Sequence, residues 1–172
     1  MSKFSRSKGQ RGERTVAKLL QERLHCEVSR QLSASRDGGC DIKIHLGPIT
    51  YLIEVKYHTK VSQSIIEGWW TQAIIQSALQ ASKYANPIPI LIYKQTHWKA
   101  WECRMPWQYA LWQLERTNRY NPTYTMKTHH VTVPIDILAD IMNGSKHKTI
   151  SSGKMYVSDN NDIDRTTLGV KP

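Results

Sequence analysis

The chain has 172 residues, of which 40% are hydrophobic; this is enough for one domain with its own core and excludes a fully disordered protein. Its formal net charge of +10 predicts an anionic partner, either nucleic acid or an anionic membrane surface. The longest apolar runs are far shorter than the roughly 20 residues that a membrane-spanning helix needs. The basic N-terminus also lacks the apolar centre of a secretory signal, so we favour nucleic acid.

Residues 1–11 are basic and contain no acid, and we interpret them as a flexible arm. Further along, apolar residues recur at steps of three and four, which is the spacing of an amphipathic helix. We expect this first helix to begin at Lys8 or Gly9 and to end at Leu24.

Short strands and turns are expected after this helix. Cys26–Leu32 has the composition of a strand, and residues 33–39 have that of a turn or loop. Asp41–Leu46 alternates apolar and polar residues, Gly47-Pro48 breaks the run, and Thr50–Tyr57 reads as the next strand. The last two segments predict a β-hairpin.

The second half of the chain predicts further helices and strands. The expected elements are a helix over Ser62–Tyr84, strands over Ile88–Tyr93 and His97–Cys103, and helices over Pro106–Arg116 and Pro134–Asn143. Residues 144–172 are rich in Ser, Lys, Asn and Asp and are interpreted as a flexible tail behind a domain over residues 12–143. The order of elements predicts an α/β or α+β arrangement with a mixed sheet.

The chain has three cysteines, Cys26, Cys40 and Cys103. Because no two of them form a Cys-x-x-Cys pair, a zinc knuckle is not predicted. We interpret them as free thiols of a cytosolic protein.

A possible site lies on the expected hairpin. Glu54 and Lys56 are two positions apart on one strand, so both side chains project from the same face. Asp41 opens the preceding strand and can approach Glu54 from across the hairpin. Two carboxylates at strand ends are hard oxygen ligands of the kind that Mg²⁺ or Mn²⁺ prefers. Lys56 beside such a metal would orient the attacking water or stabilise the charge that grows on a phosphate.

Each of these residues also has a plainer interpretation. Glu54 and Lys56 are typical of a charged stripe on a half-exposed strand, and an aspartate after two glycines is typical of a turn. The combination favours a site: Gly-Gly-x-Asp, a gap of hairpin length, Glu-x-Lys and then a long helix, all on a strongly basic chain.

The segments GGCDI and YLIEVK resemble the PD-(D/E)XK nuclease signature, with Cys40 where the signature often has proline. The opening KGQRGERTVAKLL is similar to the first helix of the archaeal-type Holliday junction resolvases and related phage enzymes. The resemblance covers about Lys8–Lys94, roughly half of the chain. It implies an α/β fold with a restriction-endonuclease-like core, in which helices flank a mixed central β-sheet.

The resemblance also implies a site and an activity. Its catalytic residues are Glu13, Asp41, Glu54 and Lys56, of which the three carboxylates are the metal ligands. The implied enzyme is a Mg²⁺- or Mn²⁺-dependent DNA endonuclease, structure-selective like a Holliday junction resolvase, and a homodimer in the cytoplasm of a prokaryotic or phage-infected cell. The alternatives are a restriction or repair nuclease, a non-catalytic nucleic-acid-binding protein on the same fold, and a protein-interaction module.

Basic residues on the arm, the first helix and the following loop are candidates for phosphate contacts. The predicted DNA-binding residues are Lys8, Arg11, Arg14, Arg30 and Arg36, with Gln72, which matches a glutamine on the family's later helix. The alternatives are a solvated basic arm, a helix-surface role for Gln72, and a helix-start carboxylate for Glu13.

Histidine and tryptophan residues leave two further interpretations open. His58 shares the face of Lys56 and is either a surface histidine or a phosphate contact. Trp69 and Trp70 are adjacent on a helix and cannot both face one core. One could stack on a base or fill a dimer interface, or both could straddle the edge of the core.

Overall fold

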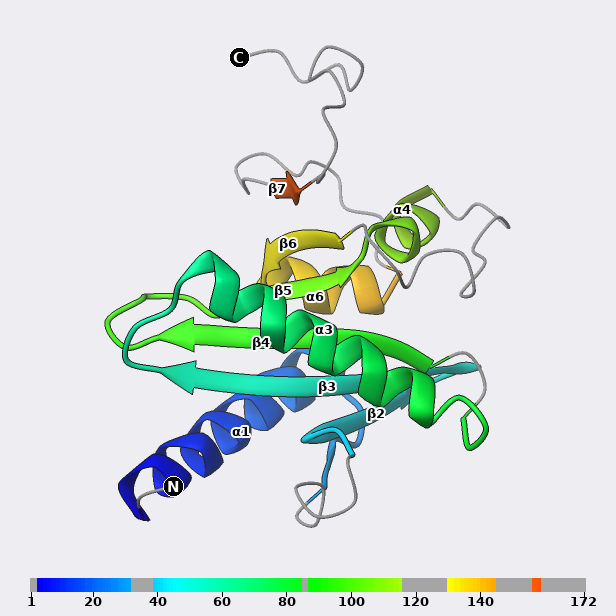
Figure 1. Cartoon of the computed structure of the whole chain (residues 1–172). Helices are drawn as coiled ribbons and strands as arrows, with labels where there is room; N and C mark the ends of the chain where they lie inside the picture. Colours follow the sequence, from blue (N-terminus) through cyan, green and yellow to red (C-terminus); the bar gives the residue numbers. More distant parts are fainter. Residues whose placement is uncertain (1–2, 32–38, 85–86, 116–129, 145–155, 159–172) are drawn as a thin grey trace.

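The computed structural model describes residues 3–31, 39–84, 87–115, 130–144 and 156–158, which form a seven-stranded sheet with helices on both faces (Figure 1). The helices are α1 (Lys3–Leu24), α3 (Gln63–Leu79), α4 (Trp107–Glu115) and α6 (Ile135–Met142). The strands are β1 (Ser29–Arg30), β2 (Ile42–Leu46), β3 (Ile49–His58), β4 (Pro87–Gln95), β5 (Glu102–Pro106), β6 (His130–Pro134) and β7 (Tyr156–Ser158). Within these ranges, no helix has both the length and the apolar character needed to cross a membrane.

The strands follow one another across the sheet in chain order, from β1 to β7. All neighbours are antiparallel except β3 and β4, which are parallel. A parallel pair needs a crossover connection, and α3 provides it (Figure 1). The predicted hairpin of β2 and β3 and the predicted mixed sheet flanked by helices are both confirmed.

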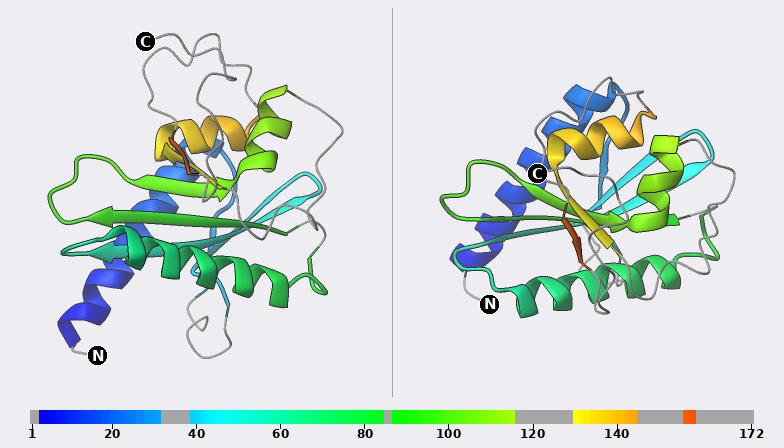
Figure 2. Two further views of the ribbon diagram at one scale, coloured as in Figure 1. Left: turned by 45° about the horizontal axis from the view of Figure 1, so that its top comes forward. Right: turned by 90° about the horizontal axis from the view of Figure 1, so that it is seen from above.

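Strand alternation divides the side chains between two layers. Helices α1 and α6 cover one face of the sheet and α3 covers the other (Figure 2). Ile53 and Val55 of β3 belong to the large apolar core on the α1 face. Leu91 and Tyr93 of β4 belong to a smaller cluster with residues of α3. The polar residues that alternate with Ile53 and Val55 along β3 therefore face α3.

The first helix begins earlier than predicted, at Lys3 rather than at Lys8 or Gly9, so residues 3–11 of the predicted arm form its first turns. These turns carry no apolar stripe, so periodicity did not reveal them. Once the second half of the helix is packed on the sheet, each further turn propagates from an existing nucleus and needs no apolar contact of its own. Residues 1–2 lie outside the described part, and the domain boundary at residue 12 stays a prediction.

Three other segments differ from the predicted pattern. Strand β5 begins at Glu102 rather than His97, which lies in a turn with a φ of 78°. Helix α3 ends at Leu79 rather than Tyr84. Strand β6 was not predicted, and it pairs with β7, which lies within the predicted tail. The other tail residues beyond 144 lie outside the described part.

Helix α1 packs closely against β3 at Gly12. A Cβ at Gly12 would lie 3.1 Å from Tyr57 Cβ and 3.3 Å from Trp101 Cη2, whereas a Cβ at Gly9 would meet nothing within 4 Å. Gly9→Ala is therefore expected to raise the free energy of unfolding by about 0.5–1 kcal/mol through helix propensity. Gly12→Ala requires Tyr57 and Trp101 to shift by a few tenths of an ångström, and it is expected to lower the free energy of unfolding by about 1–3 kcal/mol. Urea denaturation measures both, and equal stabilisation would contradict the close packing.

Candidate active site

The candidate site lies where β2 begins and β3 continues past it. Strand β2 starts at Ile42, opposite Ile53, so extending the antiparallel register by one residue places Asp41 opposite Glu54. The Asp41 N–H donates to the Ile53 carbonyl at 3.0 Å, and Asp41 Oδ2 accepts from the Val55 N–H at 2.8 Å. These two contacts with the backbone of β3 fix the orientation of Asp41 just before β2.

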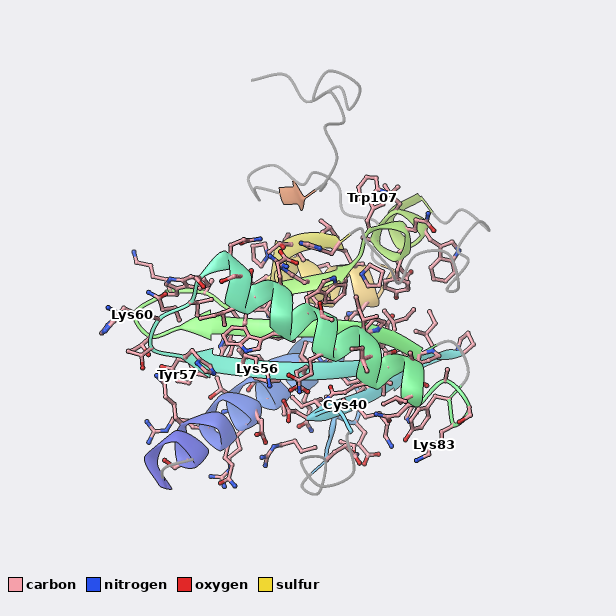
Figure 3. The ribbon with its side chains drawn as sticks, viewed as in Figure 1. Cys40, Lys56, Tyr57, Lys60, Lys83 and Trp107 are labelled. Carbon is pink, nitrogen blue, oxygen red and sulfur yellow. The ribbon has the colours of Figure 1, made fainter. Side chains whose placement is uncertain are left out.

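Glu54 and Lys56 project from one face of β3, and Figure 3 shows Lys56 on this strand between α1 and α3. Glu54 is only 4% exposed, and its Oε1 accepts from Lys56 Nζ at 2.5 Å. Gln72 of α3 donates from Nε2 to the same oxygen at 3.4 Å. Glu54 Oε2 is buried and has no hydrogen-bond partner among the described residues. Such an oxygen is costly unless something else satisfies it.

Helix α1 brings a third carboxylate to the vicinity of this pair. Glu13 Oε2 accepts from Arg30 Nη2 of β1 at 2.8 Å, and both side chains are partly buried. The negative charge of Glu13 contributes to raising the pKa of Asp41. Among the described residues, no three His, Cys, Asp or Glu side chains form a group that could hold a metal ion. The ligand role of Glu13 therefore stays a prediction, with Arg30 as its present partner.

The predicted DNA-binding residues take different places around the site. Arg11 and Arg14 are exposed on α1, Arg30 pairs with Glu13, Gln72 contacts Glu54, and Arg36 lies outside the described residues. Lys8 Nζ donates to Thr59 Oγ1 at 3.1 Å and to Thr96 Oγ1 at 2.7 Å, and it lies 4.7 Å from the centroid of the Tyr57 ring. Lys8 thus ties α1 to the end of β3. Contact of these residues with DNA stays a prediction.

The two facing carboxylates suit a divalent cation. The pKa of Asp41 is raised to about 7, first by burial and second by the charge of Glu54, while the Val55 N–H and Lys56 oppose the shift. Two carboxylates held together with one oxygen unsatisfied are stabilised by a positive ion between them. Mg²⁺ typically takes only one or two protein carboxylates, with water and substrate phosphate completing its octahedron. A pair of carboxylates such as Asp41 and Glu54 is therefore the number that Mg²⁺ needs, and their role as ligands stays a prediction.

The raised pKa of Asp41 makes the metal-free protein less stable at alkaline pH. Between about pH 4 and pH 7 the folded state binds a proton that the unfolded state has released, so stability falls as pH rises through this window. Asp41→Asn removes the titrating group and is expected to stabilise the protein by about 1–3 kcal/mol at pH 8, with little effect at pH 4. Thermal denaturation in EDTA at both pH values checks this. A destabilised variant at pH 8 would contradict the described environment of Asp41.

The same face of the sheet carries an ion pair, between a buried arginine and a partly exposed glutamate, that sequence reasoning missed. Arg104 of β5 is 3% exposed and donates from Nη1 to Glu67 Oε1 of α3 at 2.8 Å. The strand register connects Glu54 through Leu91 to Arg104 in one row across the sheet. The pair thus ties α3, which carries Gln72, to the strands. It was missed because β5 was expected too early in the chain; with the true strand, alternation would have placed Arg104 on this face.

Comparisons with known proteins identify a matching family and a similar solved structure. The family described as "Phage putative PDDEXK endonuclease" matches residues 4–152. Among solved structures, a Holliday junction resolvase of the archaeal hyperthermophile Archaeoglobus fulgidus is similar at 22% identity and a TM-score of 0.39, over 63% of this chain and 80% of that one. No curated protein matches the chain. The superfamily predicted from GGCDI and YLIEVK is confirmed: the chain belongs to the phage PD-(D/E)XK endonuclease family.

Proposed function

We propose that this endonuclease hydrolyses phosphodiester bonds of DNA with Mg²⁺ or Mn²⁺ held by Asp41 and Glu54. The observation that carries the proposal is the buried, unsatisfied Oε2 of Glu54 beside Asp41, because a cation would satisfy that oxygen. The net charge of +10 supports a polyanionic substrate.

The residues around the proposed metal position have different roles in the reaction. Gln72 and Lys56 both donate to Glu54 Oε1 and leave Oε2 for the cation. The Val55 N–H keeps Asp41 turned towards the same place. A bound divalent ion supplies a Lewis acid that polarises the phosphoryl oxygen and acidifies water. The Lys56 ammonium orients the attacking water or stabilises the charge that develops on the phosphate.

Within this class we propose a structure-selective enzyme that acts on branched DNA as a homodimer. The support is the likeness of residues 8–20 to the first helix of the resolvases and related phage enzymes. Two opposed cuts at a four-way junction need two active sites, which a homodimer provides. Such an enzyme would act in the cytoplasm of a prokaryotic or phage-infected cell. A restriction or repair nuclease is the alternative that fits the same residues.

The experiment is cleavage of a labelled four-way junction and of a linear duplex with the sequence of one arm, in Mg²⁺ and then in Mn²⁺. We expect the junction to be cut by paired incisions and faster than the duplex. Equal cutting of both substrates would support the nuclease activity and contradict the proposed selectivity for branched DNA. If neither DNA is cut in either metal but both are bound, the non-catalytic binding protein becomes the better account.

A further inference from the structure

An aromatic pair continues the carboxylate site along β3. His58 lies two residues beyond Lys56 on the same face, and its ring centroid is 4.7 Å from that of Trp69. Trp69 precedes Gln72 by three residues on α3, so both share one side of the helix. Helix and strand run in opposite directions, so Gln72 meets Glu54 while Trp69 meets His58.

The pair is supported from the core side and open to solvent. The Trp69 ring lies 6.5 Å from the Tyr93 ring, which in turn lies 6.0 Å from the Trp98 ring. Tyr93 is buried and Trp69 is partly buried, whereas His58 is exposed. The indole thus contacts the buried Tyr93 ring and the ring of the exposed His58, to which it is tilted by 49°. A rigid aromatic surface loses little conformational entropy when a ligand stacks on it.

The charges around the pair suit a nucleic-acid strand. Lys8 Nζ is held beside Thr59 at 3.1 Å, and Lys60 is exposed at the end of β3, where Figure 3 shows it. The pKa of His58 is lowered, first by partial burial and then by the charges of Lys56 and Lys8, which favours the neutral ring. His58 therefore presents an aromatic surface, and the lysines supply the positive charge for phosphates. This combination is how proteins bind unpaired bases.

We infer that His58 and Trp69 form a stacking platform for an unpaired nucleobase of the DNA strand that occupies the carboxylate site. An extended strand rises about 3.3 Å per residue, so the platform lies about 13 Å from Glu54, close to the reacting phosphate but not at it. The bases of an intact duplex are stacked within the helix and cannot reach a platform beside the backbone. The platform thus selects DNA that has unpaired bases near the cut. This inference rests on the proposed function and deepens it.

The test uses 2-aminopurine, a fluorescent base, in DNA bound to the full-length protein in EDTA, where no metal is available for cleavage. The base is placed at an unpaired position next to a branch in one DNA and inside a matched duplex in another. We expect binding to quench the unpaired base and to leave the paired one unchanged. We define the affinity ratio as the affinity for the DNA with the unpaired base divided by the affinity for the matched duplex. In His58→Ala and in Trp69→Leu this ratio is expected to fall about tenfold, which corresponds to the loss of one base–aromatic stack.

Trp107→Phe is the matched control, because Trp107 lies on α4, away from Lys56 in Figure 3. It is expected to keep the wild-type affinity ratio. Trp69 packs against buried rings, so circular dichroism checks that Trp69→Leu is folded. If Trp69→Leu is unfolded, the test rests on His58→Ala, because His58 is exposed and its replacement leaves the core intact. Wild-type quenching and affinity ratio in His58→Ala would overturn the platform.

The outcome for the platform and the outcome for the nuclease can be separated. Binding is measured without cleavage, so quenching that depends on His58 supports the platform whether or not the protein cuts DNA. Failure of the wild type to cut DNA in Mg²⁺ would contradict only the proposed nuclease activity. Conversely, metal-dependent cleavage with no preference for unpaired bases in any of these proteins would overturn the platform and leave the nuclease intact.

Discussion

Replacing Lys56 with alanine is expected to lower the single-turnover rate of DNA cleavage about 10²–10⁴-fold. The ammonium lies 2.5 Å from Glu54 Oε1, where it can orient water or stabilise charge on the phosphate. The same change removes a cation that competes for Glu54, so the affinity for Mn²⁺ is not expected to weaken. Excess enzyme on labelled DNA measures the rate, and isothermal titration calorimetry measures the affinity.

Lys18 offers the matched control for this change. Its side chain is exposed on α1 and pairs only loosely with Glu22, at 3.7 Å. Lys18→Ala removes one positive charge from the surface and is expected to cut DNA at nearly the wild-type rate. If Lys56→Ala cuts as fast as Lys18→Ala, Lys56 has no part in the chemistry and the assignment of the site fails.

Glu54→Gln is expected to weaken Mn²⁺ binding by more than about 100-fold, because losing even an outer partner of a metal ligand costs roughly 10–100-fold. The amide keeps the size of the side chain but removes the charge and the unsatisfied carboxylate oxygen that a cation would use. Cleavage is expected to be lost together with the metal. Titration calorimetry with Mn²⁺ and the cleavage assay check the two effects on one protein preparation.

Glu22→Gln tests whether the effect of Glu54→Gln is local. Glu22 is exposed on α1, and its carboxylate contacts Lys18 at the surface. The same chemical change at Glu22 is expected to leave Mn²⁺ affinity within about twofold, since an exposed ion pair contributes little. Full metal affinity in Glu54→Gln would place the cation elsewhere and exclude Glu54 as a ligand.

The hairpin that carries the site could be predicted from local sequence. Residues 41–46 alternate, residues 50–57 have the composition of a strand, and Gly47 between them adopts a φ of 57°, which glycine takes without strain. Since strand alternation fixes the face of every residue, the shared face of Glu54 and Lys56 followed from their spacing alone. The approach of Asp41 to Glu54 followed from the register that the short turn imposes.

The contacts that complete the site could not be predicted from spacing. Gln72 reaches Glu54 only because α3 crosses the sheet at a particular rotation, and Arg30 reaches Glu13 only because β1 lies beside β2. Both contacts join elements that are distant in the sequence and depend on how the layers pack. Local patterns do not encode that packing, so the partners of the carboxylates emerged only from the structure.

Strand β6 shows a second limit of local patterns. Val131 and Val133 alternate with polar residues, but the run is short and ends at Pro134, which was interpreted as the start of a helix. Strand β6 pairs with β5, which begins later in the chain than predicted, and with β7, which lies within the predicted tail. A strand of five residues is stabilised by pairing with its neighbours. A local pattern of apolar residues does not reveal that pairing.

The most direct test of the carboxylate site is single-turnover cleavage of a labelled four-way junction by wild-type protein and Asp41→Asn, in Mg²⁺, in Mn²⁺ and in EDTA. Asp41 Oδ2 is oriented by the Val55 N–H, and the variant keeps the shape of the side chain while removing its charge. We expect cleavage by the wild type only when metal is present, and none above background by a folded Asp41→Asn. Cleavage in EDTA, or cleavage by Asp41→Asn at the wild-type rate, would contradict a metal-dependent nuclease built on Asp41 and Glu54.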